Sequence, residues 1–393
     1  MDRRRFLFNA AALGCSLAAS PFVTPVAFAS GPWENRLVVI VLRGAMDGLD
    51  AVRPLGDPDY AGLRPTLNRG DALPLSEFWG LHPGLAPLLP LWRLGEMGVM
   101  HAVSTPYRDG RSHFDGQDIL EAGTLTVRGS NGGWLNRMLS AVPGMTAETA
   151  YAIGQEEMAI LSGPAPHLRW SPEVTFDLSP QARRLLEVTL HDDPLFRDAA
   201  LQAVAIADEL TVEALDEGAD AMPARAGGTV TAADLATFAA GRLRGATRIA
   251  SFSVNGWDTH QNQAASLTAT LGRLSETILA LRDGLGPVWD KTAVLCLTEF
   301  GRTARENGTR GTDHGTGGAM IYAGGALRGG MVAGRWPGLS EAALYDRRDL
   351  MPTADVRAAA GWVMRGLFGL DAGQVEQIVF PGLDLGARPE FLL

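Results

Sequence analysis

Short, continuous apolar runs recur along the chain, each bounded by Gly or by polar residues. The first, at 35–44 (NRLVVIVLRG), is rich in β-branched residues. Such a run is typical of a strand buried on both faces of a sheet, whereas a strand with one face in water alternates apolar and polar residues. The same pattern predicts further strands at 97–104, 247–256, 291–301 and 317–325.

Helical periodicity lies between these runs. Residues 265–286 place apolar side chains at helical spacing over many turns, and residues 352–370 predict a helix near the C-terminus. Residues 112–123 begin at Ser112, a candidate N-cap, and stop at a Gly, and residues 84–95 contain Pro and predict a short helix. Strands that alternate with helices predict an α/β fold, in which a large, mostly parallel sheet is sandwiched between helices.

Residues 180–246 interrupt this alternation. They are rich in Ala, Asp and Glu, have helical periodicity and contain a loose stretch at 216–231. A length of 393 residues allows one large α/β domain or two smaller ones. We interpret 180–246 as a helical insertion on the domain at 30–393, with a separate small domain as the alternative.

The first 29 residues predict an export signal. Arg3 and Arg4 open a basic start, an apolar stretch follows, and Ala27-Phe28-Ala29 is a small-residue cleavage site. The paired arginines favour the twin-arginine pathway, which exports folded proteins, over an ordinary secretory signal. We therefore expect a periplasmic or secreted protein, with the twin-arginine machinery as a partner and no transmembrane segment in the mature chain.

Cysteine content and charge agree with this interpretation. Cleavage would remove Cys15 and leave Cys296, which lies in an apolar run and predicts core packing rather than a disulfide. The composition, 46% hydrophobic and 20% charged, is that of a globular protein. The formal charge of −10 argues against nucleic acid or an anionic membrane as a partner, since both attract basic surfaces.

Polar residues that bind metals follow several predicted strands. In open α/β sheets, ligands bind beyond the carboxyl ends of the strands. Each motif alone is weak, because an Asp-Gly or an Asp-His-Gly is often only a turn. Their co-occurrence predicts a divalent metal, Zn²⁺, Mn²⁺ or Mg²⁺, as one or two ions. The candidate ligands are Asp47, Asp258, His260, Glu299, Asp313 and His314.

Ser112 is the candidate nucleophile. At the start of a helix, free N–H groups and the helix dipole favour an anion, and a metal can activate a hydroxyl there. Arg111 and Arg43 are candidates for binding the anion through their guanidinium groups, as is Arg302. The alternative is that Ser112 only caps the helix and His113 lies on its first turn.

Seven motifs in order resemble a known family. The sequence is similar to the twin-arginine-exported family called domain of unknown function 1501, a resemblance that covers nearly all of the mature chain. That family resembles the alkaline phosphatase and sulfatase superfamily, which implies a large mixed sheet between helices and a metal centre at the strand ends. The motifs are LVVIVLRGAMDGLDAVRP, LHPGLAPL, RSHFDGQDILEAG, GWLNRML, GWDTHQNQ, TEFGRT and DHGTGG.

The resemblance implies roles for single residues. Asp47 is similar in place to the superfamily's first metal-binding Asp, and Ser112 to its helix-capping nucleophile. Asp258 and His260 resemble the Asp/His pair of one metal site. His314 falls where the last metal-binding His lies.

Two departures change what the resemblance implies. Glu299 falls where the superfamily has an Asp followed by His, but the next residue is Phe300, so one ligand of the usual two-metal site is missing. We therefore expect a single metal or a weakened second site. The chain has no Cys-x-Pro-x-Arg motif, which excludes the formylglycine chemistry of sulfatases.

The sequence thus predicts an exported, metal-dependent hydrolase or transferase that acts on a small anionic phosphate or sulfate ester. The metal would ionise Ser112 for attack, and an arginine would stabilise the transferred group. The first alternative is a binding or assembly protein on the same scaffold, without turnover. A weaker alternative is a glycan-binding module that uses tryptophans as stacking surfaces: Trp33, Trp79, Trp134, Trp170 and Trp257.

Overall fold

The structure is a computed structural model. The residues it describes are 33–108, 110–126, 132–142, 149–154, 158–170 and 231–393. The predicted signal at 1–29 lies outside the described residues, as does most of the predicted insertion at 180–246. The end of that insertion is described, and it forms helix α9 (Ala232–Arg244).

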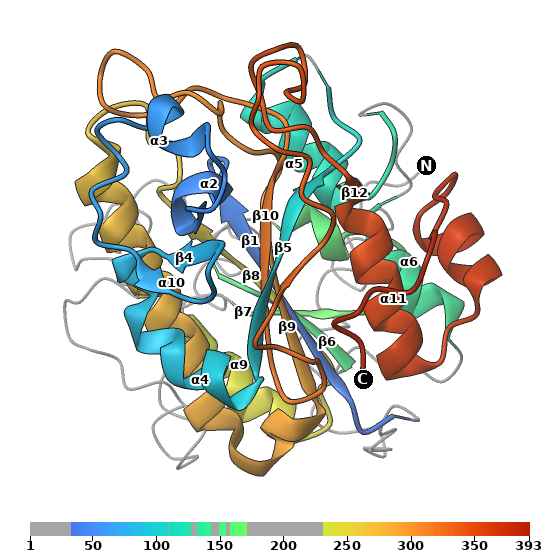
Figure 1. Cartoon of the computed structure of the whole chain (residues 1–393). Helices are drawn as coiled ribbons and strands as arrows, with labels where there is room; N and C mark the ends of the chain where they lie inside the picture. The colour runs from blue at the N-terminus through green and yellow to red at the C-terminus, as the bar shows by residue number, and fades with distance from the viewer. Residues whose placement is uncertain (1–32, 109, 127–131, 143–148, 155–157, 171–230) are drawn as a thin grey trace, which may run out of the picture.

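A nine-stranded mixed sheet forms the centre of the fold (Figure 1). Only β10 runs antiparallel to its neighbours, and the other described pairings in this sheet are parallel. The predicted large, mostly parallel sheet is therefore confirmed. The strand order is β11 (Val332–Ala333), β5 (Met97–Ser104), β10 (Gly318–Ala323), β9 (Thr292–Leu297), β1 (Arg36–Arg43), β8 (Ile249–Asn255), β6 (Ala150–Ile153) and β7 (Leu168–Trp170), and β12 (Ala354–Asp355) pairs with β5.

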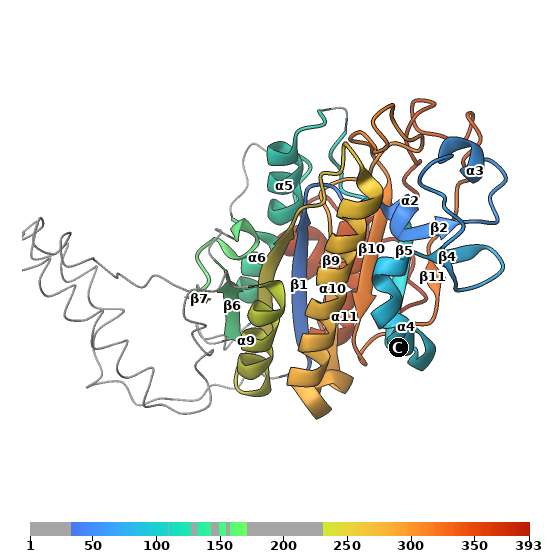
Figure 2. The same cartoon turned by 90° about the vertical axis from the view of Figure 1, so that its left-hand side faces the viewer.

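Helices cover both faces of the sheet. On one face, α5 (His113–Ala122), α6 (Trp134–Ala141) and α11 (Val356–Phe368) pack against Leu37, Val39 and Val41 of β1. On the other, α4 (Leu89–Leu94), α9 and α10 (Gln263–Leu285) pack against the residues between them in β1 (Figure 2). Two apolar cores explain why the strand is a continuous apolar run rather than an alternating one.

A small antiparallel sheet and several short elements complete the described fold. The 3-10 helix η1 precedes α4, and helices α2 and α3 follow β1 in the chain. Their bounds are β2 (Val52–Pro54), β3 (Leu73–Pro74), β4 (Trp79–Leu81), α2 (Gly48–Ala51), α3 (Tyr60–Leu63), η1 (Pro83–Leu88), η3 (Ala159–Leu161), η4 (Gly286–Lys291) and η5 (Gln374–Val379).

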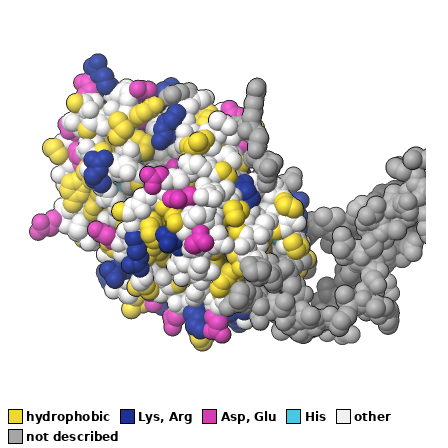
Figure 3. Space-filling model, turned by 90° about the vertical axis from the view of Figure 1, so that its right-hand side faces the viewer, with side chains coloured by type: hydrophobic (Ala, Val, Ile, Leu, Met, Phe, Trp, Pro, Cys, Tyr) yellow, Lys and Arg dark blue, Asp and Glu magenta, His cyan; other side chains and the backbone are white. Residues whose placement is uncertain are grey.

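The surface and core agree with the composition. On the face drawn in Figure 3, basic and acidic side chains are interspersed. Cys296 is a free, buried cysteine in the core beside α10. Trp134 and Trp257 are also buried, as core packing requires. Within the described ranges, no helix is long and apolar enough to cross a membrane.

The strand directions gather several loops at one edge of the sheet. The parallel strands β1, β5, β8 and β9 end there. Because β10 runs the opposite way, it begins at that edge, and the loop that leads into it lies there too. The carboxyl edge therefore brings together chain segments near residues 44, 112, 258, 300 and 314.

Candidate metal centre

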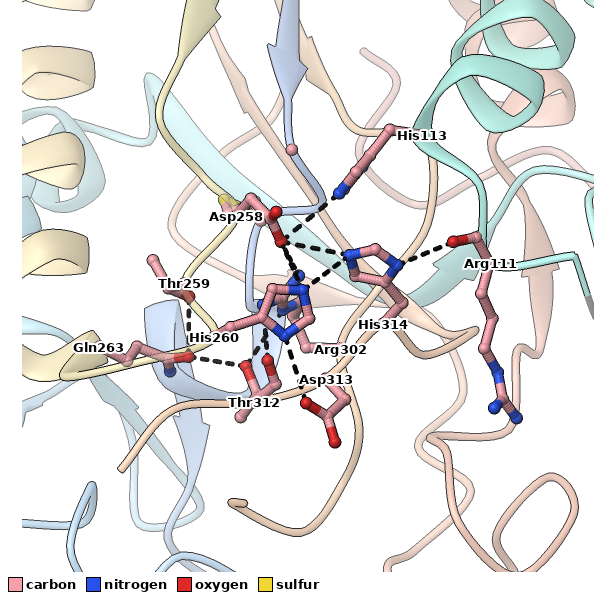
Figure 4. Close-up of polar contacts among 12 residues, drawn as sticks. Arg111, His113, Asp258, Thr259, His260, Gln263, Arg302, Thr312, Asp313 and His314 are labelled. Carbon is pink, nitrogen blue, oxygen red and sulfur yellow. Dashed lines mark hydrogen bonds and ion pairs between the residues drawn. The ribbon is translucent and has the colours of Figure 1, made fainter. Parts of the chain in front are cut away.

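Three imidazoles and one carboxylate converge at this edge (Figure 4). The Nε2 atoms of His260, His314 and His113 lie 3.0, 3.2 and 3.4 Å from Oδ1 of Asp258. His260 Nε2 and His314 Nε2 are 3.0 Å apart. One ligand atom from each of His113, Asp258 and His314 lies within 4.8 Å of the others.

The fold delivers these side chains from three segments. Asp258 and His260 follow β8, and His314 lies four residues before β10. His113 is the first residue of α5, the helix that follows β5. Strand direction brings Asp258, His260 and His314 to one edge, and the packing of α5 on the sheet brings His113 to them.

Each imidazole meets a hydrogen-bond acceptor at its other nitrogen. Nδ1 of His113 is 2.8 Å from Oε1 of Glu299, and Nδ1 of His260 is 3.2 Å from Oδ1 of Asp313. Nδ1 of His314 is 2.8 Å from the backbone carbonyl oxygen of Arg111. With the proton of the neutral ring on Nδ1, each Nε2 would present a lone pair, which is the arrangement seen behind metal-bound histidines.

The donor set fits a divalent cation. With both rings protonated on Nδ1, the lone pairs of His260 Nε2 and His314 Nε2, 3.0 Å apart, would repel each other unless a cation lay between them. The buried Nε2 of His113 has no hydrogen-bond partner. In a tetrahedral site with ligands about 2.0–2.1 Å from the metal, the ligand atoms are about 3.3–3.5 Å apart. The three separations from Oδ1 of Asp258 and the separation between His260 and His314, 3.0–3.4 Å, are close to this spacing. Three nitrogens and one oxygen, with no sulfur, suit Zn²⁺ or Mn²⁺.

The electrostatics of the site favour ionised carboxylates and, at His314, a neutral ring. Burial alone would raise the pKa of Glu299, but hydrogen bonds from His113, Gln117 and the backbone outweigh it and lower that pKa. The hydrogen bond from His113 to Glu299 in turn raises the pKa of His113. Burial lowers the pKa of His314, which favours the neutral ring that a metal needs.

Arg302 holds the shared carboxylate. Its Nη1 donates to Oδ1 of Asp258 at 2.7 Å, and it is itself fixed by Oγ1 of Thr312 at 3.1 Å and the Thr312 carbonyl at 2.6 Å. Burial would raise the pKa of Asp258, but the hydrogen bond and charge of Arg302 outweigh it and lower that pKa. Arg302 was predicted to stabilise a transferred anion, whereas here its buried side chain positions Asp258.

Asp47 does not join the cluster. Its fully buried carboxylate accepts hydrogen bonds from Arg64 at 2.6 and 3.2 Å, from Nε2 of Gln263 at 2.6 Å, and from the backbone N–H of Leu49. Gln263 also accepts from Thr259 and so ties Asp47 to the loop that carries Asp258. The predicted first metal-binding Asp is a structural support, because Arg64 already neutralises its charge.

Glu299 and Asp313 contact the imidazoles of the cluster on the side away from Asp258. Both were predicted as ligands, and both instead bind the Nδ1 atoms of His113 and His260. His113 takes the place that the sequence assigned to Glu299. The Ser-His-Phe stretch signals only a helix start, and nothing in the sequence shows that His113 reaches across to Asp258.

The remaining predicted residues flank the centre. Arg43 forms an ion pair with Glu121 at 2.8 Å and donates to Gln117 at 2.9 Å. Arg111 adopts a left-handed backbone (φ 51°) that aims its carbonyl at His314, and its exposed side chain extends away from the cluster (Figure 4). Oγ of Ser112 accepts from the backbone N–H of Asp115 at 3.3 Å and caps α5.

Phe300 forms an aromatic wall of the site. Its ring stacks on His113 with centroids 5.2 Å apart and lies 5.3 Å from the ring of His314. The residue that stands where a second-site His was expected therefore packs against two imidazoles. This apolar contact restricts the orientation of both rings and excludes water from one side of them.

The sequence profile of one family, described as a protein of unknown function (DUF1501), matches residues 103–368. The matched region includes His113, Asp258, His260 and His314 and most of the described sheet. The chain belongs to this family. A comparison with curated proteins gives no match.

Two solved structures are similar to this chain. One is the lipoteichoic acid synthase LtaP from Listeria monocytogenes, at 9% identity and a TM-score of 0.41, with 95% of this chain and 81% of that chain covered. The other is a protein in the alkaline phosphatase superfamily from Vibrio parahaemolyticus, at 13% identity and a TM-score of 0.35, with 84% and 71% covered. Both TM-scores are below 0.5, so the proposals below rest on the residues of this chain.

Proposed function

We propose that the protein is an exported, metal-dependent hydrolase or transferase that acts on a phosphate or sulfate ester. The observation that carries the proposal is the convergence of three Nε2 atoms on Oδ1 of Asp258, with every Nδ1 already bound to an acceptor. His113, Asp258, His260 and His314 would hold the cation. When bound, a divalent cation polarises an ester oxygen and lowers the pKa of a coordinated hydroxyl group.

Ser112 is the nucleophile in this proposal. It directly precedes His113 and caps a ten-residue helix, where its Oγ accepts from the backbone N–H of Asp115. The free N–H groups of that terminus favour an anionic substrate. Ser112 attacks the phosphorus or sulfur atom, the alcohol leaves, and water or a second alcohol then takes the group from Ser112.

The site is open enough for a substrate. The side chains of Asp258 and His260 are 44% and 38% exposed, whereas Arg302 and Glu299 beneath them are fully buried. A rigid buried layer under an exposed ligand layer keeps the ligand geometry fixed while a substrate approaches from solvent.

The alternative is a non-catalytic protein with a structural ion. One observation favours it: the Nε2 atoms of His113, His260 and His314 all lie within 3.4 Å of Oδ1 of Asp258, and four protein ligands would leave no open position on the ion, as in structural rather than catalytic zinc sites. On this alternative the centre would bind metal with similar ligands but give no turnover.

Two variants of Ser112, one that keeps the helix cap and one that removes it, separate the nucleophilic role of this residue from its structural role. Asn caps helices as well as Ser does, but it has no hydroxyl, whereas Ala lacks both properties. Ser112→Asn should retain metal binding and thermal stability and lose turnover of aryl phosphate and aryl sulfate esters. Ser112→Ala should lose turnover and about 1 kcal/mol of stability. Full turnover by Ser112→Asn contradicts the nucleophile, and a metal-loaded wild type that turns over no ester supports the alternative.

The proposal includes export through the twin-arginine pathway to the periplasm or beyond. The support is the paired Arg3-Arg4 start and the Ala27-Phe28-Ala29 site. Replacing both arginines by lysine should retain the precursor inside the cell, as cell fractionation measures. Export of that variant at the wild-type level contradicts the assignment.

A further inference from the structure

A cavity of about 700 Å³ lies beside the metal centre. Asp313 and Asn307 form part of its wall, and they also hold His260. Asp313 accepts from Nδ1 of His260 at 3.2 Å, and Nδ2 of Asn307 donates to Asp313 and to the backbone carbonyl of His260, each at 3.0 Å. The volume is within the range of about 300–1,000 Å³ that is typical of small-molecule sites.

The lining of the cavity includes both apolar and cationic side chains. Leu63, Leu339 and Leu344 supply apolar surface. In the part of the chain that the structure describes, the guanidinium of Arg305, which also lines the cavity, has no hydrogen bond or ion pair to another side chain. A guanidinium without a protein partner can bind a carboxylate, phosphate or sulfate through two parallel hydrogen bonds.

Most of the acidic groups that line the cavity are already engaged. Both oxygens of Glu306 accept backbone N–H groups of Thr66 and Leu67. Glu341 pairs with Arg347. Asp59 remains, at the N-terminus of α3, and its charge would direct the negative end of a ligand towards Arg305.

Backbone strain marks the same cavity. Asp346 and Arg347 adopt consecutive left-handed conformations, with φ of 50° and 55°. This conformation is unfavourable for residues other than glycine, and such strain concentrates at functional sites. The strained turn presents Arg347 and Arg348 to the cavity.

We propose that this cavity is a second substrate subsite, which binds the alcohol part of the ester through an acidic group on that part. The inference rests on the proposed function for the identity of the ligand as substrate. Arg305 recognises the acidic group, and the leucines pack against the carbon skeleton. Because Asp313 and Asn307 are shared, a ligand in the subsite also fixes the orientation of His260.

Binding to the metal-free protein tests the subsite without catalysis. The full chain is stripped of metal with a chelator, dialysed and titrated calorimetrically with phenylphosphonate, which has an apolar ring and one acidic group. We expect one saturable site. Arg305→Ala should weaken binding about tenfold or more, which is the loss expected for hydrogen bonds to a charged group.

Two further variants make the result specific. A Cβ on Gly62, which lines the cavity, would meet nothing within 4 Å, so Gly62→Leu should fill the space without distorting α3 and abolish binding. Arg93→Ala, on α4 and outside the cavity lining, is the matched control and should bind as the wild type does. Absence of binding to the wild type, or equal binding by Arg305→Ala, overturns the subsite. Failure of the proposed function would appear instead as absent metal-dependent turnover with phenylphosphonate binding intact.

Discussion

Glu299 holds His113 rather than the cation. Its buried carboxylate accepts from Nδ1 of His113, from Nε2 of Gln117 and from the backbone N–H of Gly44, all through Oε1. A carboxylate behind an imidazole fixes the ring and makes the outer nitrogen a stronger ligand. At the residue scale, the metal affinity of the centre therefore depends on a side chain that would not touch the metal.

Glu299→Gln tests this dependence. Gln keeps the shape and an acceptor oxygen but loses the charge, so zinc affinity should fall about 10–100-fold, as for other residues behind metal ligands. Competition with a chromophoric chelator measures the affinity. Glu96→Gln is the control, because Glu96 pairs with Arg282 and Trp289 away from the centre. Equal affinity of Glu299→Gln and the wild type would contradict the role of Glu299.

Asp47→Asn should change stability without changing metal content. Burial alone would raise the pKa of Asp47, but the charge and hydrogen bonds of Arg64 outweigh it and lower that pKa. Removing one partner of a buried ion pair costs about 3–5 kcal/mol of unfolding free energy. One zinc per chain should still bind, as metal analysis measures. If Asp47→Asn bound no zinc, Asp47 would have to be a metal ligand, contrary to this account.

The same variant gives a pH dependence with a definite sign. A carboxylate whose folded-state pKa is lowered contributes stability above its unfolded pKa of about 3.9 and loses it as pH falls through the folded value. The stability difference between wild type and Asp47→Asn should therefore be full near neutral pH and shrink on acidification below about pH 4. Denaturant unfolding at a series of pH values measures it, and a difference that grows on acidification would contradict this account.

The sequence predicts some site residues better than others for a physical reason. Asp258, His260 and His314 lie in Gly-flanked loops directly beside strands, so strand direction alone places them at one edge. His113 lies on a helix, and its direction depends on how α5 packs on the sheet. Asp47 and Glu299 look like ligands because carboxylates at strand ends often are, and only tertiary contacts show that Arg64 and His113 already occupy them.

At the scale of elements, close turns at the strand ends set the geometry. Gly44, directly after β1, has φ of 118°, and a Cβ there would lie 2.7 Å from the backbone nitrogen of Asp258. Both facts require glycine: the backbone conformation is strained for other residues, and no space is left beside the loop that carries Asp258.

Gly44→Ala should therefore weaken zinc binding and cost at least about 1–3 kcal/mol of unfolding free energy. Gly272→Ala is the matched control, for which the expected change in stability has the opposite sign. It lies inside α10, where a Cβ meets nothing within 4 Å, so it should stabilise the protein by about 0.5–1 kcal/mol and leave zinc affinity unchanged. Thermal unfolding and chelator competition measure both. Wild-type zinc affinity in Gly44→Ala would show that this close approach does not position Asp258.

The predicted elements agree with the structure where the pattern is long. The five predicted strands and the helix at 265–286 are present within a few residues, because buried strands and long amphipathic helices have strong periodic signals. The C-terminal helix begins at Val356 rather than 352, since Asp355 caps it and 354–355 pair with β5. The short β6, β7 and three-stranded sheet were missed, because two to four residues carry too little pattern.

At the scale of the whole molecule, one antiparallel strand makes the centre possible. β10 is the only described strand of the large sheet that runs antiparallel to its neighbours, and the loop that leads into it carries His314 to the loop that carries Asp258 and His260. In the proposed centre, three segments that are far apart in the chain would share one ion, so a bound cation would cross-link the sheet to α5. A cation that binds only the native state should increase the free energy of unfolding by about 2.7 kcal/mol at a free concentration of 100 times its Kd. The unfolding temperature should rise accordingly.

Zinc titration of the metal-stripped full chain tests the central claim most directly, with wild type and His113→Ala compared in the same chelator competition. His113 is the informative position, because only the folded geometry assigns it to the centre. We predict one zinc per wild-type chain and an affinity at least about tenfold weaker in His113→Ala, because loss of a direct ligand should cost no less than loss of a residue behind one, which costs about 10–100-fold. Absence of zinc binding by the wild type, or equal affinity in the two proteins, would contradict the account.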